Sequence, residues 1–131
     1  MVITVAISPG ELIDKITILE IKCTRLRDPE QIEQVRAELK ALETARAGAI
    51  PSSLELAALT TDLKAVNTKL WDAEDALRDC ERHGDFGPSF VELARSVYRH
   101  NDQRSTLKRS INTLLGAKFQ EVKCYAPYAQ S

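Results

Sequence analysis

Residues 7–22 read ISPGELIDKITILEIK, and this stretch decides the fold because it opens a helix that is apolar on more than one side. Ser8 is a good capping residue before Pro9, and Glu11 stands where a glutamate can reach back to the amide of the cap. The apolar residues form one seam and a second group beside it: Leu12, Ile16, Leu19, Cys23 and Leu26, then Ile13, Ile18 and Ile21. One neighbour cannot cover both, so we expect a central helix that touches two or three others or a second subunit.

Three further helix starts are visible in the sequence. Asp28 precedes Pro29, and two serine-led boxes, SSLE at 52–55 and SFVE at 89–92, supply the other caps. Glycine and proline mark turns at 48–51 and 83–88. The sequence therefore predicts an all-α protein, a four-helix antiparallel bundle in a single domain over 1–131, with helices near 9–27, 29–47, 53–82 and 89–115.

Apolar spacing supports these helices and suggests how they pair. The second carries a stripe of Ile32, Val35, Leu39 and Leu42, and the third a longer seam of Leu56, Leu59, Leu63, Val66, Leu70, Ala73, Leu77 and Cys80. Such seams pack as coiled-coil-like pairs, so short connections predict that the second and third helices are antiparallel neighbours and that the fourth folds back along the third. The apolar excess of the first helix, and a third helix of ~45 Å beside a second of ~28 Å, predict a homodimer or larger assembly.

The two ends of the chain differ from the bundle. Residues 2–7 are rich in β-branched side chains, and residues 118–125, KFQEVKCY, follow Gly116, which is a plausible helix stop. One alternative is a short two-stranded β-ribbon that joins the termini, and the other is two irregular tails that lie on the helices.

Composition excludes several classes of function. Eighteen basic and nineteen acidic residues nearly cancel, which disfavours nucleic-acid binding. The apolar run at 2–7 is too short for a signal or a membrane span, so a cytoplasmic protein is expected. Cys23, Cys80 and Cys124 lack CxxC spacing and are expected to be reduced, and with two histidines in the chain no metal site and no cofactor is predicted.

The fourth helix has a polar interruption. Its stripe begins with Phe90, Ala94 and Val97 and ends with Ile111 and Leu115, but the positions between them are Asn101, Arg104 and Lys108. The third helix offers a matching polar strip of Asn67, Trp71, Glu74, Arg78 and Glu81, with Asp75 beside it. Helix rise places Glu74 and Trp71 level with residues 97–104, so these two polar faces are expected to meet.

Two interpretations of the meeting faces stay open. In the first, a structural network, Glu74, Asp75 and Glu81 pair with Arg95, Arg104 and Lys108 and fix the register of the two helices. In the second, a ligand pocket is lined by Trp71, Tyr98, Asn101, Arg95, Arg104 and Lys108. Arginine and lysine beside an aromatic ring suit a phosphate, a carboxylate or a sugar-bearing ligand.

The segments SPGELIDKITILEIK and LWDAEDALRDCERHGDFGPSFVELARSVYRHNDQRSTLKRSIN, together with EVKCYAPY near the end, resemble a bacterial family of unknown function. Residues 28–69 match it only in helical character, and Cys124 stands where relatives tend to carry serine. The resemblance implies a link to glycosyltransferase and surface-polysaccharide contexts, but no established activity. It places in the family motif Glu74, Asp75, Arg78, Glu81, Arg95, Tyr98, Asn101, Asp102, Arg104, Lys108 and Asn112.

The function predicted first is a non-catalytic helical module that binds a small anionic ligand or a protein partner, or that assembles. The alternative is a Mg²⁺-dependent all-α nucleotide pyrophosphohydrolase, since Glu11-x-x-Asp14 and Asp72-x-x-Asp75 have the required spacing, although the glutamate-rich double motif of such enzymes is absent. A helical chorismate mutase ranks third, because Glu11 stands where a dicarboxylate needs a basic residue. No Ser-His-Asp or Cys-His arrangement and no phosphate-binding glycine loop is evident.

Overall fold

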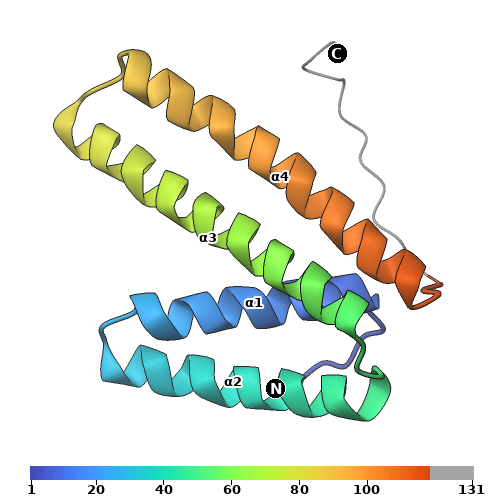
Figure 1. Ribbon diagram of the computed structural model, residues 1–131. Helices are drawn as coiled ribbons and strands as arrows, with labels where there is room; N and C mark the ends of the chain where they lie inside the picture. Colours follow the sequence, from blue (N-terminus) through green and yellow to red (C-terminus); the bar gives the residue numbers. More distant parts are fainter. Residues whose placement is uncertain (119–131) are drawn as a thin grey trace.

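The computed structural model describes residues 1–118, which form four helices: α1 (Pro9–Arg25), α2 (Pro29–Ala49), α3 (Leu54–His83) and α4 (Pro88–Leu114) (Figure 1). The all-α bundle is confirmed, and each helix begins and ends within two residues of the predicted position. Residues 1–118 contain no strand, and the predicted partner of residues 2–7, the segment 118–125, lies outside the described residues except for Lys118. No helix within 1–118 combines the length and apolarity that crossing a bilayer requires.

Local capping explains where three of the helices begin. Ser8, Asp28 and Ser53 each accept a hydrogen bond from a backbone N–H two or three residues further on, at 3.0 to 3.2 Å. These bonds satisfy donors that have no partner inside a helix, so the predicted caps Ser8 and Asp28 are confirmed, whereas the third cap is Ser53, one residue after the serine that leads the predicted box.

The start of α4 differs from the prediction. Gly87 is its N-cap and makes no side-chain bond, and Pro88 rather than Ser89 is the first helical residue. Proline lacks the N–H that would otherwise be unsatisfied there and already has a helical φ, so α4 begins without a capping side chain.

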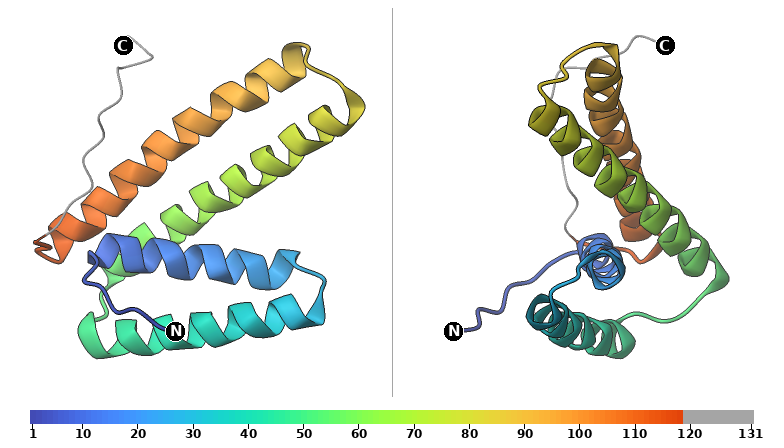
Figure 2. Two further views of the ribbon diagram at one scale, coloured as in Figure 1. Left: turned by 180° about the vertical axis from the view of Figure 1, so that it is seen from behind. Right: turned by 90° about the vertical axis from the view of Figure 1, so that its left-hand side faces the viewer.

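α1 is the central helix, as its apolar residues predicted. It contacts α2 on one side and both α3 and α4 on the other, and the ribbon views show it between α2 and the α3–α4 hairpin (Figures 1 and 2). The fully buried core joins three helices and consists of Ile13, Leu56, Leu63 and Ile111. The apolar excess of α1 is therefore covered within one chain.

The predicted pairing of α2 with α3 is wrong. Among the described residues α2 contacts α1 and no other helix, and none of its residues is buried. Its stripe from Ile32 to Leu42 is half-buried against α1. The seam of α3 is already occupied by α4 and α1, so a short connection from α2 to α3 did not make these two helices neighbours.

The N-terminus of α1 approaches α4 very closely at Gly10. The backbone N–H of Gly10 donates to Oδ1 of Asn112 at 2.7 Å. A Cβ built on Gly10 would lie 2.5 Å from the backbone oxygen of Lys108, closer than real Cβ atoms approach. Glycine is therefore required here by space, since its φ is not positive.

We predict that Gly10→Ala lowers the free energy of unfolding by about 1 to 3 kcal/mol, because the methyl group forces two backbones apart in a packed contact. Gly48→Ala is the matched control, since Gly48 lies in α2 and a Cβ added there would meet no atom within 4 Å. It should stabilise the protein by about 0.5 kcal/mol through helix propensity. Urea unfolding of both variants measures the difference, and equal stabilities would contradict the close approach.

Candidate functional site

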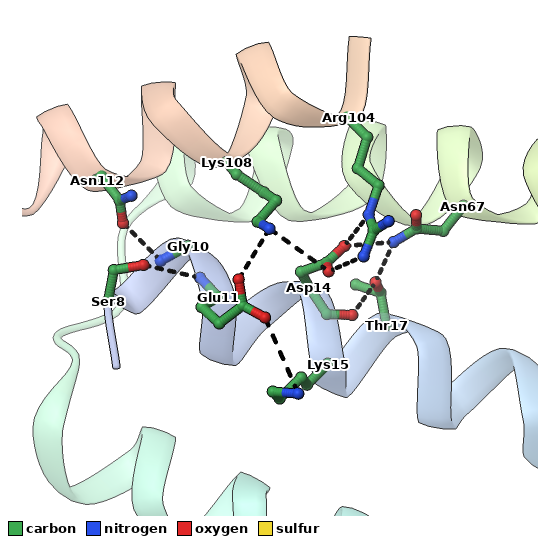
Figure 3. Close-up of polar contacts among 10 residues, drawn as sticks. All are labelled: Ser8, Gly10, Glu11, Asp14, Lys15, Thr17, Asn67, Arg104, Lys108 and Asn112. Carbon is green, nitrogen blue, oxygen red and sulfur yellow. Dashed lines mark hydrogen bonds and ion pairs between the residues drawn. The ribbon is translucent and has the colours of Figure 1, made fainter. Parts of the chain in front are cut away.

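A buried carboxylate, Asp14, organises the polar contacts between α1, α3 and α4 (Figure 3). Asp14 is only 1% exposed. Its Oδ1 accepts hydrogen bonds at 2.9 Å from Nε of Arg104 and from Nδ2 of Asn67, and its Oδ2 accepts one from Nη2 of Arg104. The arginine therefore binds the carboxylate with two nitrogens, which is the strongest geometry for such a pair.

A second cation lies one turn further along α4. Nζ of Lys108 is 2.8 Å from Glu11 and 4.0 Å from Asp14, and the lysine side chain is 9% exposed. Asp14 and Lys108 are thus buried within this layer of opposite charges, while Glu11 and Arg104 keep about a third of their side chains exposed. A charge in such a place is tolerated only when it is paired and hydrogen-bonded. We call the residues of this layer the buried polar layer: Glu11, Asp14, Thr17, Asn67, Arg104 and Lys108.

The prediction that acids of α3 bind Arg104 and Lys108 is wrong. The acids come from α1, and Glu74 and Asp75 are exposed. The expected reach of Glu11 back to its own cap is not seen either, because its carboxylate lies between Lys108 and Lys15. α1 packs against the polar interruption of α4, so the acids that pair with Arg104 and Lys108 come from α1. The acids of α3 are exposed.

An open groove lies next to the buried polar layer, where α1, α3 and α4 meet. It encloses about 480 Å³ and is lined by Ile18, Ile21, Asn67, Leu70, Trp71, Glu74, Arg78, Asn101 and Arg104. Arg104 and Asn67 belong to both the groove and the layer, so the layer forms one wall of the groove. We call this the central groove. Its volume falls in the range of small-molecule sites.

The structure brings half of the predicted site residues into the central groove. Five line it, from two helices: Trp71, Glu74, Arg78, Asn101 and Arg104. The other five lie elsewhere: Asp75 beside Arg78, Arg95 beside Glu92, Tyr98 exposed on α4, Asp102 in a depression between α3 and α4, and Lys108 in the buried polar layer. The level of Trp71 against Asn101 and Arg104 along the helices follows the prediction.

Sequence reasoning missed the central part that α1 plays in the site. Asp14 and Thr17 are buried polar residues, and Ile18 and Ile21 line the central groove. One signal was present in the sequence, because an aspartate in the middle of a helix that is apolar on most sides needs a buried partner. Gly10, which lets α1 approach α4, was the second signal.

The acids that were considered as a magnesium site are bound to cations instead. Asp14 and Glu11 pair with Arg104 and Lys108, and Asp72 accepts from Arg25 at 2.6 Å. That exposed hydrogen bond raises the pKa of Arg25, which is charged at every accessible pH. No group of three or more potential ligands suited to a metal ion occurs in the described part of the chain.

The cysteines show no redox arrangement within residues 1–118. Cys23 and Cys80 are free and half-buried in apolar seams. Cys124 lies outside the described residues.

Fold and site together define a helical protein in which a charge-balanced buried layer supports an open groove. The chain matches the model of the family of unknown function DUF6165 over residues 3–129, and it belongs to that family. No curated protein and no solved structure shows detectable similarity to the chain.

We predict that Asp14→Asn costs about 3 kcal/mol or more of unfolding free energy, because it removes the charge of the buried carboxylate that binds Arg104 and lies near Lys108. Asp79→Asn is the control, since it breaks an exposed ion pair with Arg82 and should change stability by about 0.5 kcal/mol or less. Guanidinium unfolding measures both. A loss of the same size for the two variants would show that burial of Asp14 contributes nothing.

Arg104→Met is expected to be costly as well, by about 3 kcal/mol, because Asp14 stays buried and loses its two-nitrogen partner. The double variant Asp14→Leu with Arg104→Met should regain much of that loss, since an apolar pair of similar volume needs no compensating charge. Thermal unfolding of the single and double variants tests this. If the second change made the loss larger, the pair would not act as a unit.

Proposed function

We propose that this protein is a non-catalytic binding module that takes a small anionic ligand in the central groove. One observation carries the proposal: Trp71, Asn101 and two arginines from α3 and α4 converge on a groove of about 480 Å³. The convergence supports the pocket interpretation of the sequence, and the buried polar layer supports the network interpretation for different acids. We therefore propose both interpretations, for adjacent parts of one site.

The chemistry of the groove favours a ligand with an acidic group and a ring. Asp14 holds Nε and Nη2 of Arg104, which fixes the plane of this guanidinium in the groove wall. Phosphate and carboxylate groups match the fork geometry of arginine. Trp71, Ile18 and Ile21 supply an apolar surface for a ring, and Asn101 and Glu74 can bond to hydroxyl groups.

The biological context belongs to the proposal too. The resemblance to a family linked to glycosyltransferases and surface polysaccharides favours a nucleotide sugar or a sugar phosphate, because each combines the required acidic group and ring. A cytoplasmic location fits such a ligand and also remains a prediction.

No observation favours the alternative of a Mg²⁺-dependent pyrophosphohydrolase. Its predicted carboxylates at Glu11, Asp14 and Asp72 are each engaged by an arginine or a lysine. A metal ion would have to displace these partners. Release of pyrophosphate from nucleoside triphosphates in the presence of Mg²⁺ is the assay that would revive this alternative.

We predict that a nucleotide sugar, tested alongside inorganic phosphate and sulfate, changes the fluorescence of Trp71 and raises the melting temperature. Trp71 is the single tryptophan of the chain, so its emission reports directly on the groove. At a ligand concentration one hundred times Kd, stability should rise by about 2.7 kcal/mol, because only the folded state binds. If none of these anions moves either signal, the proposal is wrong.

A matched pair of arginine variants tests the place of binding. Arg78 lines the central groove and Arg82, one turn further along α3, does not, and both are exposed beside an aspartate. Arg78→Met should leave stability within about 0.5 kcal/mol and weaken binding about tenfold, whereas Arg82→Met should change neither. Equal binding by the two variants would place the ligand elsewhere.

A further inference from the structure

The α3–α4 hairpin has a second groove, on the face that α1 does not cover. Two depressions of about 420 and 620 Å³ lie next to each other along the seam of the two helices, with Thr106 in the lining of both. Only residues of α3 and α4 line them. Its apolar floor consists of Leu59, Val66, Leu107 and Leu114. We call this the outer groove.

No helix within residues 1–118 covers the outer groove. α1 packs on the other face of the α3–α4 hairpin, and α2 lies on the far side of α1 and contacts α1 alone among the described helices (Figure 2). Leu114, which lines the outer groove, is 38% exposed.

Charge is divided between the two walls of the outer groove. The α3 wall carries Glu55 and Asp62, and the α4 wall carries Arg109 in the depression that Glu55 lines and Arg99 in the depression that Asp62 lines. Within residues 1–118, Glu55, Asp62 and Arg109 form no ion pair, while Arg99 lies 3.2 Å from Glu92 at the surface. Asp102 lies in the same depression as Arg99 and partly offsets its charge.

We propose that the outer groove binds a second copy of this chain, related by a two-fold axis parallel to the hairpin. This operation places α3 of each copy over α4 of the other at the same level along the helices. Glu55 and Asp62 of one copy then face Arg109 and Arg99 of the other, twice over. A two-fold axis perpendicular to the helices would instead place acidic α3 on acidic α3.

This surface differs from the one that the sequence suggested for a dimer. Most of the apolar excess of α1 is buried by α2, α3 and α4 of the same chain, and its half-buried Ile18 lines the central groove. The division of charge on the hairpin supplies the reason for a second copy and also fixes its orientation. The central groove is lined by different side chains and stays open in the assembly.

The test uses two variants with reversed charge. Glu55→Arg with Asp62→Arg makes both walls basic, and Arg99→Glu with Arg109→Glu makes both walls acidic. Each variant alone should be monomeric by light scattering and sedimentation at micromolar concentration, with Kd raised about tenfold to a hundredfold. An equimolar mixture of the two should form a dimer, because each wall then faces a wall of opposite charge.

The control is Glu33→Arg with Glu38→Arg, which changes the net charge as much as Glu55→Arg with Asp62→Arg does, but on the exposed surface of α2. It should remain a dimer like the native protein, and circular dichroism should show native helix content for all variants. A monomeric native protein would overturn the proposal. Dimers formed by each reversed variant alone, or dissociation of the control, would overturn it as well. A mixture of the two reversed variants that stays monomeric would also overturn it, and is the result expected if the groove binds a helix of another protein.

Discussion

The fold depends on one buried carboxylate and the cost of leaving it without partners. Asp14 sits on the buried face of α1 among isoleucine and leucine side chains, and it is stable there because Arg104, Asn67 and the nearby Lys108 compensate its charge. These partners come from α3 and α4, so the requirement holds three helices at one distance and one rotation. Apolar seams alone would allow neighbouring registers, since leucine and isoleucine pack in several ways. Gly10 makes the contact possible by letting the backbones approach.

The central groove follows from the same layer. α1 is held against α3 and α4 at Asp14, and the groove opens beside this point, between the three helices. An arginine that is fixed by a buried acid and also lines an open surface is oriented before any ligand arrives, which lowers the entropy cost of binding. Structure and binding are therefore carried by the same side chain. A substitution of Arg104 therefore changes stability and binding together. Substitutions of Arg78 and Trp71 can change binding alone, because neither residue belongs to the buried polar layer.

Most of the fold could be predicted because its signals are local. Caps and turns at Ser8, Asp28 and Ser53 placed the helices, and the apolar pattern identified α1 as the central one. The site was predicted in part, since the polar interruption of α4 and the level of Trp71 depend only on helix rise. The partners of Arg104 were not predicted, because consecutive helices were paired by default. The pairing of helices is a long-range property. It depends here on whether α1 or α2 covers the polar face of α4, and the apolar pattern of a single helix does not reveal which of the two does so.

The outlying position of α2 makes this helix the part of the described structure that we expect to unfold locally most easily. Local opening costs little where few side chains are buried, and α2 has no buried residue and rests on a single neighbour. It can detach from α1 while the three-helix core around Asp14 and Ile13 stays intact. We therefore expect the backbone amides of α2 to exchange with solvent earlier than those of the core formed by α1, α3 and α4. Proteases would enter through that helix first, and evolution can vary its sequence with the least penalty.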